Sequence, residues 1–144
     1  MKKALLVCLL VALAASVAAT QVYTPIFRTP VQVPSTLVNT ASGEQAPSIT
    51  GDGLTLYFCS NRAGGPGGMD LWMVTRQNLA SPWTNATPVT SLSSTMADNY
   101  IDVRDDDLEL FISSTNPLNN LGSSDLFVAR RSSTSTPWVT ANLV

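Results

Sequence analysis

Hydrophobic and polar residues alternate with a period of two in two separate stretches of the chain, the pattern of a β-strand that turns one face to a protein core. Residues 54–59 read Leu-Thr-Leu-Tyr-Phe-Cys and residues 108–113 read Leu-Glu-Leu-Phe-Ile-Ser, so one face is apolar in both. Each stretch is followed by another predicted strand, at residues 70–76 and at residues 125–131, and a fourth strand of the first group is predicted at residues 87–92. After the first 19 residues, no stretch has the apolar spacing of a helix.

A turn signal stands directly before each alternating stretch. Asp52-Gly53 is the strongest short signal for a hairpin, because both central residues of such a turn adopt a positive φ. The second stretch has Asp106-Asp107 in its place. Because aspartate tolerates a positive φ less well than glycine does, the second turn is predicted to be the weaker one.

The two groups of predicted strands are similar in sequence and read as two copies of one unit. The matching segments are residues 49–60 with 103–114 at an offset of 54, and residues 70–74 with 125–129 and Pro82-Trp83 with Pro137-Trp138 at an offset of 55. An antiparallel unit of four strands, repeated in the sequence, is typical of a propeller blade. The sequence therefore predicts an all-β fold with two antiparallel, four-stranded β-propeller blades, which is an incomplete propeller.

The first copy carries a run of short motifs at residues 51–76. They are the Asp-Gly turn, a Leu-Tyr-Phe strand, a Ser-x-Arg-x-Gly-Gly loop at residues 60–65 and an Asp-Leu-Trp strand, followed by Pro82-Trp83. In this order the motifs resemble the TolB-like, WD-like β-propeller repeat, from which the second copy departs in its turn and its loop. The resemblance implies an exported or periplasmic protein that serves mainly as a scaffold for binding.

The first 19 residues have the layout of a cleaved secretory signal peptide. Two lysines give a positive start, residues 4–15 are apolar, and Val17-Ala18-Ala19 supplies the small residues that a signal peptidase reads. The alternative is an uncleaved anchor, but residues 4–19 are fewer than the roughly 20 that a spanning helix needs. The prediction is cleavage after Ala19, a secreted or periplasmic protein, and no stable membrane span after cleavage.

The chain divides into four predicted segments. These are a signal peptide at residues 1–19, an N-terminal segment with a candidate closing strand at residues 20–40, the first propeller repeat at residues 41–95, and a second repeat, truncated at its last strand, at residues 96–144. Two blades alone leave two large apolar faces in water. We therefore expect either a homo-oligomer of about two to four chains that closes a ring, or a fragment of a longer propeller.

Charge and composition exclude several classes of function. After cleavage at Ala19 the chain has six arginines, ten acidic residues and no lysine, a formal charge of −4, so it offers no basic surface to nucleic acid. It contains no histidine, which removes the commonest general base and the usual nitrogen ligand of zinc. The glycine-rich residues 63–68 lack the Gly-Lys of a phosphate-binding loop and are predicted to connect two strands tightly. No catalytic residue, cofactor or metal site is predicted.

The second copy contains one dense group of acidic residues: Asp98, Asp102, Asp105, Asp106, Asp107 and Glu109. Oxygen ligands suit Ca²⁺, but the spacing differs from that of a calcium loop, and alternate residues of a strand point to opposite faces. A solvated hairpin turn is the prediction, and ion binding by Asp102, Asp105, Asp106 and Asp107 is the open alternative. Asp70 and Asp125 recur at the start of a strand, where each is predicted to accept hydrogen bonds from loop amides.

Three tryptophans, Trp72, Trp83 and Trp138, are candidate stacking surfaces for a sugar. Trp72 is replaced by Phe127 in the second copy, a change that a core position tolerates. Trp83 and Trp138 keep their identity and are the better candidates for ligand contact, although packing between blades is the preferred interpretation. Cys59 is the one cysteine left after cleavage, and it is predicted to be a small buried hydrophobe.

These observations favour an exported, non-enzymatic binding or scaffold protein with a protein or carbohydrate partner. The alternatives are a carbohydrate-active enzyme that uses only carboxylates, and a sugar-binding lectin on a propeller scaffold. The enzyme stays open because the separation of two catalytic carboxyl groups, roughly 5 to 10 Å in glycosidases, is a property of the folded chain.

Overall fold

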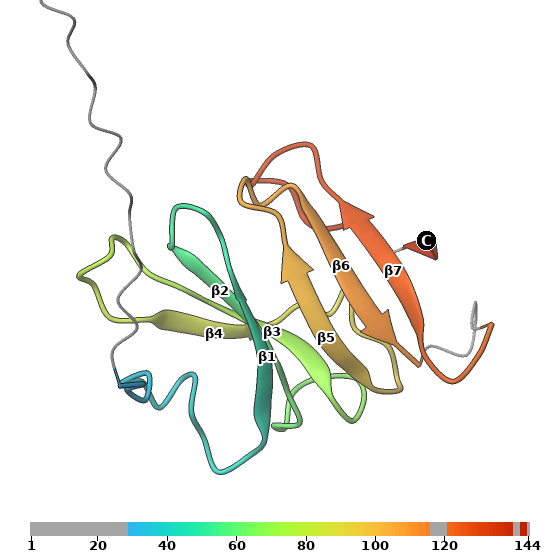
Figure 1. The fold of residues 1–144 in the computed structure, drawn as a ribbon, viewed down its shortest axis with the longest axis horizontal. Coiled ribbons are helices and arrows are strands. Elements are labelled where there is room, and N and C mark those ends of the chain that lie inside the picture. Colours follow the sequence, from blue (N-terminus) through green and yellow to red (C-terminus); the bar gives the residue numbers. More distant parts are fainter. Residues whose placement is uncertain (1–28, 116–120, 140–141, 144) are drawn as a thin grey trace, which may run out of the picture. The chain divides into compact units, whose positions relative to one another are not determined.

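The computed structural model describes residues 29–115, 121–139 and 142–143 (Figure 1), and the predicted signal peptide lies outside them. The chain divides into two units, residues 1–31 and residues 32–144, and all strands belong to the second. The strands are β1 (Glu44–Ile49), β2 (Thr55–Ser60), β3 (Asp70–Thr75), β4 (Thr84–Pro88), β5 (Asp98–Val103), β6 (Glu109–Ser114), β7 (Asp125–Arg130) and the two-residue β8 (Asn142–Leu143). Among the described residues, no helix is long and apolar enough to cross a membrane.

The strands form two antiparallel sheets in which each strand pairs with its neighbours in the sequence. The first sheet has the order β1-β2-β3-β4 and the second has the order β5-β6-β7-β8. The register is the same in both, since Ser60 pairs with Asp70 in the first sheet and Ser114 pairs with Asp125 in the second. The predicted all-β fold of antiparallel strands is therefore confirmed. Because β8 takes the fourth place in the second sheet, the candidate closing strand of the N-terminal segment does not occupy it in the described residues.

The fourth strand of the first sheet lies earlier in the sequence than predicted. β4 ends at Pro88, and the chain then turns, because the amides of Leu92 and Ser93 both donate to the Val89 carbonyl, at 3.0 and 3.1 Å. The turn buries Val89 and Leu92 in the core. The prediction of a strand over residues 87–92 is therefore wrong beyond Pro88. The pattern misled because a buried turn and a strand place apolar residues at a similar spacing.

Each predicted hairpin turn has a positive φ only at its second central residue, 70° at Gly53 and 58° at Asp107. The first central residue of each turn is an aspartate, and its side chain accepts a hydrogen bond from the backbone amide two residues later in the chain. The Leu54 amide donates to Asp52 Oδ1 at 2.9 Å, and the Leu108 amide donates to an oxygen of Asp106 at 3.1 Å. The prediction of two positive φ values is therefore wrong, because this side-chain contact stabilises a turn that needs only one.

Each sheet has two faces, because side chains alternate along a strand. On the first sheet we name the Phe58 face (Leu56, Phe58, Trp72 and Val74) and the Tyr57 face (Tyr57, Cys59, Leu71 and Met73). On the second sheet the residues at equivalent positions of the sequence form the Ile112 face (Leu110, Ile112, Phe127 and Ala129) and the Phe111 face (Phe111, Ser113, Leu126 and Val128).

The two sheets pack against each other through one face each. The Tyr57 face lies against the Ile112 face, and together they form the main core. The Phe58 face is covered by residues 32–39, which we call the strap, through Val33 and Val38. Cys59 is fully buried in the main core, and burial raises the pKa of its thiol to about 12, which confirms it as a small buried hydrophobe.

Strands β1 and β5 lie side by side where the two sheets meet (Figure 1). Equivalent positions of the sequence touch each other there: the Gly51 amide donates to the Asp105 carbonyl at 2.9 Å, and Ser48 Oγ donates to Asp102 Oδ1 at 3.4 Å. The second sheet is therefore stacked on the first head to tail, with the same face of each sheet directed the same way.

The glycine-rich loop between β2 and β3 passes close to the chain before β5. A Cβ at Gly67 would lie 2.2 Å from the carbonyl oxygen of Met96 and 2.6 Å from that of Ser94, whereas a Cβ at Gly68 would meet nothing within 4 Å. We expect Gly67→Ala to lower the urea midpoint of unfolding clearly, because backbone atoms cannot rotate away. The matched control Gly68→Ala should keep the parent midpoint, and equal midpoints for the two variants would contradict this loop path.

Candidate functional site

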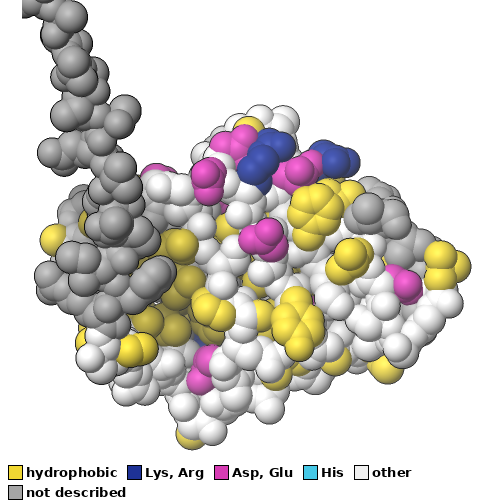
Figure 2. All heavy atoms as spheres, viewed as in Figure 1, with side chains coloured by type: hydrophobic (Ala, Val, Ile, Leu, Met, Phe, Trp, Pro, Cys, Tyr) yellow, Lys and Arg dark blue, Asp and Glu magenta, His cyan; other side chains and the backbone are white. Residues whose placement is uncertain are grey.

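The Phe111 face of the second sheet is open to solvent. Phe111 is 39% exposed and Leu126 is 58% exposed, and on β5 the neighbouring Tyr100 is 64% exposed. The equivalent side chains on the first sheet, Tyr57 and Leu71, are 1% and 0% exposed because the second sheet covers them. Figure 2 shows hydrophobic side chains at the surface over the region where Figure 1 draws β5, β6 and β7.

Charged groups lie at one end of this open face. Arg130 Nε donates to Glu109 Oε2 at 2.5 Å, and Arg104 Nη1 lies 3.5 Å from the other oxygen of the same carboxylate. Asp102, which pairs with Phe111 across β5 and β6, is exposed. The face therefore has an apolar centre and a charged edge, the arrangement found at protein interfaces.

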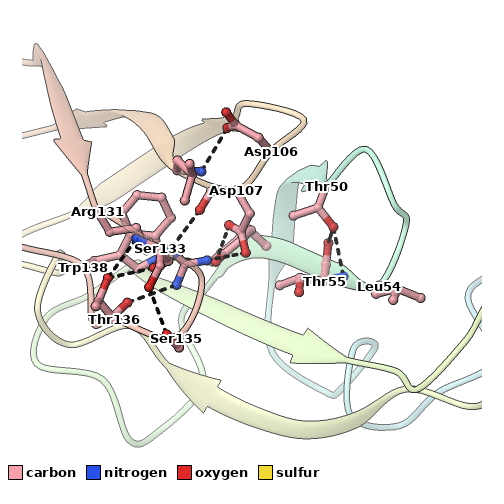
Figure 3. A network of polar contacts seen from close by, with 12 residues as sticks. Thr50, Leu54, Thr55, Asp106, Asp107, Arg131, Ser133, Ser135, Thr136 and Trp138 are labelled. Carbon is pink, nitrogen blue, oxygen red and sulfur yellow. Dashed lines mark hydrogen bonds and ion pairs between the residues drawn. The ribbon is translucent and has the colours of Figure 1, made fainter.

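A buried polar network joins the turn before β6 to the first sheet (Figure 3). Tyr57 Oη donates to Asp107 Oδ1 at 3.0 Å, and Trp138 Nε1 donates to Tyr57 Oη at 3.3 Å. Arg131 forms an ion pair with the Asp107 carboxylate, and its Nε donates to the Asp107 carbonyl at 2.7 Å. Burial raises the pKa of Tyr57 to about 12, so its hydroxyl stays a donor. The network fixes the position of one sheet on the other.

The sequence reasoning missed this network, although a signal for it is present. Arg131 lies 4.3 Å from the centre of the Trp138 ring, and Arg76 lies 4.3 Å from the centre of the Trp83 ring. Arg76 Nε donates to the Gly53 carbonyl at 2.8 Å, just as Arg131 donates to the carbonyl of the equivalent turn residue. An arginine that recurs at the end of the third strand together with a Pro-Trp pair is the sequence signal that could have revealed these contacts.

The two tryptophans predicted as ligand contacts lie on opposite sides of the first sheet. Trp138 is buried between the sheets, with its ring edge toward Tyr57 at a centroid distance of 6.4 Å. Trp83 is half-buried beside the Phe58 face. A groove of about 310 Å³ runs past Trp138, and the arginine that lines it, Arg131, is already paired with Asp107. The structure therefore does not bring Trp83 and Trp138 together into one site.

The acidic residues of the second sheet are directed to separate partners. Asp98 is buried and accepts hydrogen bonds from Ser114 Oγ at 2.5 Å and from the Ser94 amide at 2.6 Å, and burial raises its pKa. The partners of three others are Ser48 for Asp102, Arg104 for Asp106 and Arg131 for Asp107, while Asp105 is exposed. In the part of the chain that the structure describes, no three metal-ligating side chains gather.

The two aspartates at the start of the third strand of each sheet anchor the preceding loop. Asp70 Oδ1 accepts a hydrogen bond from the Gly67 amide at 3.0 Å, and Asp125 Oδ2 accepts one from the Leu121 amide at 2.6 Å. The predicted role of these two side chains, acceptance of hydrogen bonds from loop amides, is therefore confirmed.

Comparison with known proteins adds no relative. No protein-family model matches the chain, and no curated protein matches its sequence. The resemblance to the TolB-like repeat therefore stays a prediction.

Proposed function

We propose that this protein is an exported, non-enzymatic binding or scaffold module that binds a partner protein through the Phe111 face. The observation that carries the proposal is the exposure of Phe111, Leu126 and Tyr100. The residues of the first sheet that are equivalent to Phe111 and Leu126, namely Tyr57 and Leu71, are covered by the second sheet. Large apolar side chains gathered on one face, with charges at the edge, are characteristic of a protein contact.

Three further features support this function. The predicted leader directs the chain to the outside of the cytoplasm. Two antiparallel sheets stacked head to tail are the arrangement of neighbouring blades in a propeller, a fold that commonly serves as a binding scaffold. The buried carboxylates accept hydrogen bonds or ion pairs within the fold, as Asp98 and Asp107 do, which favours a structural role for them over a catalytic one.

Photocrosslinking in the cells that produce the protein tests the proposal. Benzoylphenylalanine in place of Phe111 is expected to form covalent adducts with a protein, identified by mass spectrometry, because this side chain lies on the open face. The same substitution at Leu79, which is exposed in the connection between β3 and β4, is the matched control and should form none.

Adducts at position 111 that disappear when Leu126→Arg is added support binding through this face. Absence of adducts at position 111, or equal adducts at positions 111 and 79, contradicts it. The same sample tests export, since sequencing of the mature protein is expected to begin at Thr20, and an intact N-terminus would contradict a cleaved leader.

A further inference from the structure

The contact between the two sheets shows which surface fits the open face. Inside the chain, the Tyr57 face is covered by the Ile112 face. The open Phe111 face has the same place on the second sheet as the Tyr57 face has on the first, and the Phe58 face corresponds to the Ile112 face. A contact of the same kind between two molecules would therefore place the Phe111 face of one on the Phe58 face of the other.

We propose that the occupant of the open face is a second copy of this chain, which docks its Phe58 face there after its strap has moved aside. This inference rests on the proposed function and names the partner. The contact is head to tail, so each copy contributes its second sheet on one side and its first sheet on the other. Such a contact continues the stack that already exists inside one chain.

The side chains on the two pairs of faces have matching character. On the open face, Phe111 stands at the position equivalent to Tyr57, and Leu126 stands at the position equivalent to Leu71. On the opposing surface, Phe58 and Leu56 stand where the internal contact has Ile112 and Leu110; these are large apolar side chains in each case. The external pair of faces is therefore apolar at its centre, as the internal pair is, although Ser113 stands where the internal contact has Cys59.

The strap holds the Phe58 face through few contacts. Val33 and Val38 pack on it, and Arg62 donates to the carbonyl oxygens of Leu37 at 2.6 Å and Val38 at 2.8 Å. The strap forms no strand, so it adds no ladder of backbone hydrogen bonds to the sheet. Its displacement leaves both sheets intact.

The strap does not fill the space over the Phe58 face completely. A pocket of about 150 Å³, open to the surface, lies between them and is lined by Val33, Val38, Leu56 and Phe58 among others. Trp72 Nε1 is buried on this face and has no hydrogen-bond partner among the residues that the structure describes. Incomplete packing and an unsatisfied donor each make a packed state less stable, so a better-fitting surface competes with the strap.

Native mass spectrometry of mixed chains tests this contact. Isotope-labelled wild type is mixed with unlabelled Phe111→Arg, which lacks the open face but keeps the Phe58 face. We expect wild type alone to form dimers or larger species, the variant alone to be monomeric, and the mixture to contain one-to-one dimers of wild type and variant. Leu79→Arg is the control for a new surface arginine and should assemble as wild type does.

A second pair of variants tests the strap. Val38→Ser removes a buried contact of the strap, whereas Leu37→Ser changes its exposed neighbour. We expect Val38→Ser to raise the fraction of assembled protein several-fold at equal concentration, and Leu37→Ser to leave it unchanged. Equal effects of the two variants would contradict displacement of the strap.

Two outcomes of the mixing experiment overturn the inference. One is a wild type that stays monomeric at every concentration tested; the other is a wild-type dimer that excludes Phe111→Arg, since that result requires two open faces to meet. Should Phe111→Arg unfold, Leu126→Arg gives the same test on the same face. If crosslinking from position 111 captures a different protein while the wild type is monomeric, the binding function stands and self-assembly falls.

Discussion

Replacing Asp107 with alanine is expected to lower the free energy of unfolding by about 3 to 5 kcal/mol, because it leaves the buried Arg131 guanidinium without its counterion. Tyr57 loses the acceptor of its hydroxyl in the same change. Both side chains are largely buried, with 9% of Arg131 and 11% of Asp107 exposed, so water replaces the lost carboxylate poorly. Urea unfolding followed by tryptophan fluorescence measures the effect, since Trp138 belongs to the same network.

Two variants of the same turn separate the ion pair from the turn itself. Asp106→Ala changes the exposed neighbour and removes its surface ion pair with Arg104 and its hydrogen bond from the Leu108 amide. It should therefore lower the stability, but by much less than Asp107→Ala does. Asp107→Gly removes the carboxylate but suits the φ of 58° better than alanine does, so it should be less destabilising than Asp107→Ala. An alanine variant at position 107 as stable as the one at position 106 would contradict a structural role for this network.

Truncating Leu110 to alanine is expected to lower the free energy of unfolding by about 2 to 5 kcal/mol, toward the upper end, because the neighbouring side chains of the main core have no room to collapse. Leu56→Ala should cost less. Leu56 is buried under the strap beside a surface pocket of about 150 Å³, and the strap can move to fill the lost volume. Chemical denaturation of both variants measures the difference.

Two exposed positions on the same sheet provide the controls. Leu126→Ala removes the same atoms as Leu110→Ala but from the open face, and Arg104→Ala removes a surface side chain, so both should keep nearly the parent stability. If Leu56→Ala lowered the free energy of unfolding more than Leu110→Ala, the strap would pack more tightly on its face than the two sheets pack on each other. That result would also argue against displacement of the strap.

Sequence reasoning predicted the strand content and the internal anchors because both depend on local geometry. Alternate side chains of a strand always point to opposite faces, so a period of two identifies the side chains that share a face, as it did for Leu110 and Ile112. Asp70 and Asp125 were predicted from their place at the start of a strand, where loop amides lie within reach of a short side chain. The strand predicted beyond Pro88 failed because a buried turn and a strand place apolar residues at similar spacing.

The candidate site could not be predicted as a surface from the sequence. Tyr57 and Phe111 occupy equivalent positions in similar strands, and the local pattern gives both the same environment. One is buried and the other exposed because the second sheet covers only one face of the first, and that choice depends on residues about fifty positions away. The same holds for Asp107, which the pattern placed in a solvated turn and which the fold buries against Arg131.

The sequence by itself therefore determined the strands, the apolar side of each strand and the anchoring aspartates of this protein, since these follow from side-chain alternation and short-range hydrogen bonding. Only the tertiary structure decided which faces are covered, which face stays open, and which acidic residues are buried. The physical reason is that burial is a property of the packing partner, and the partner of each face lies far away along the chain.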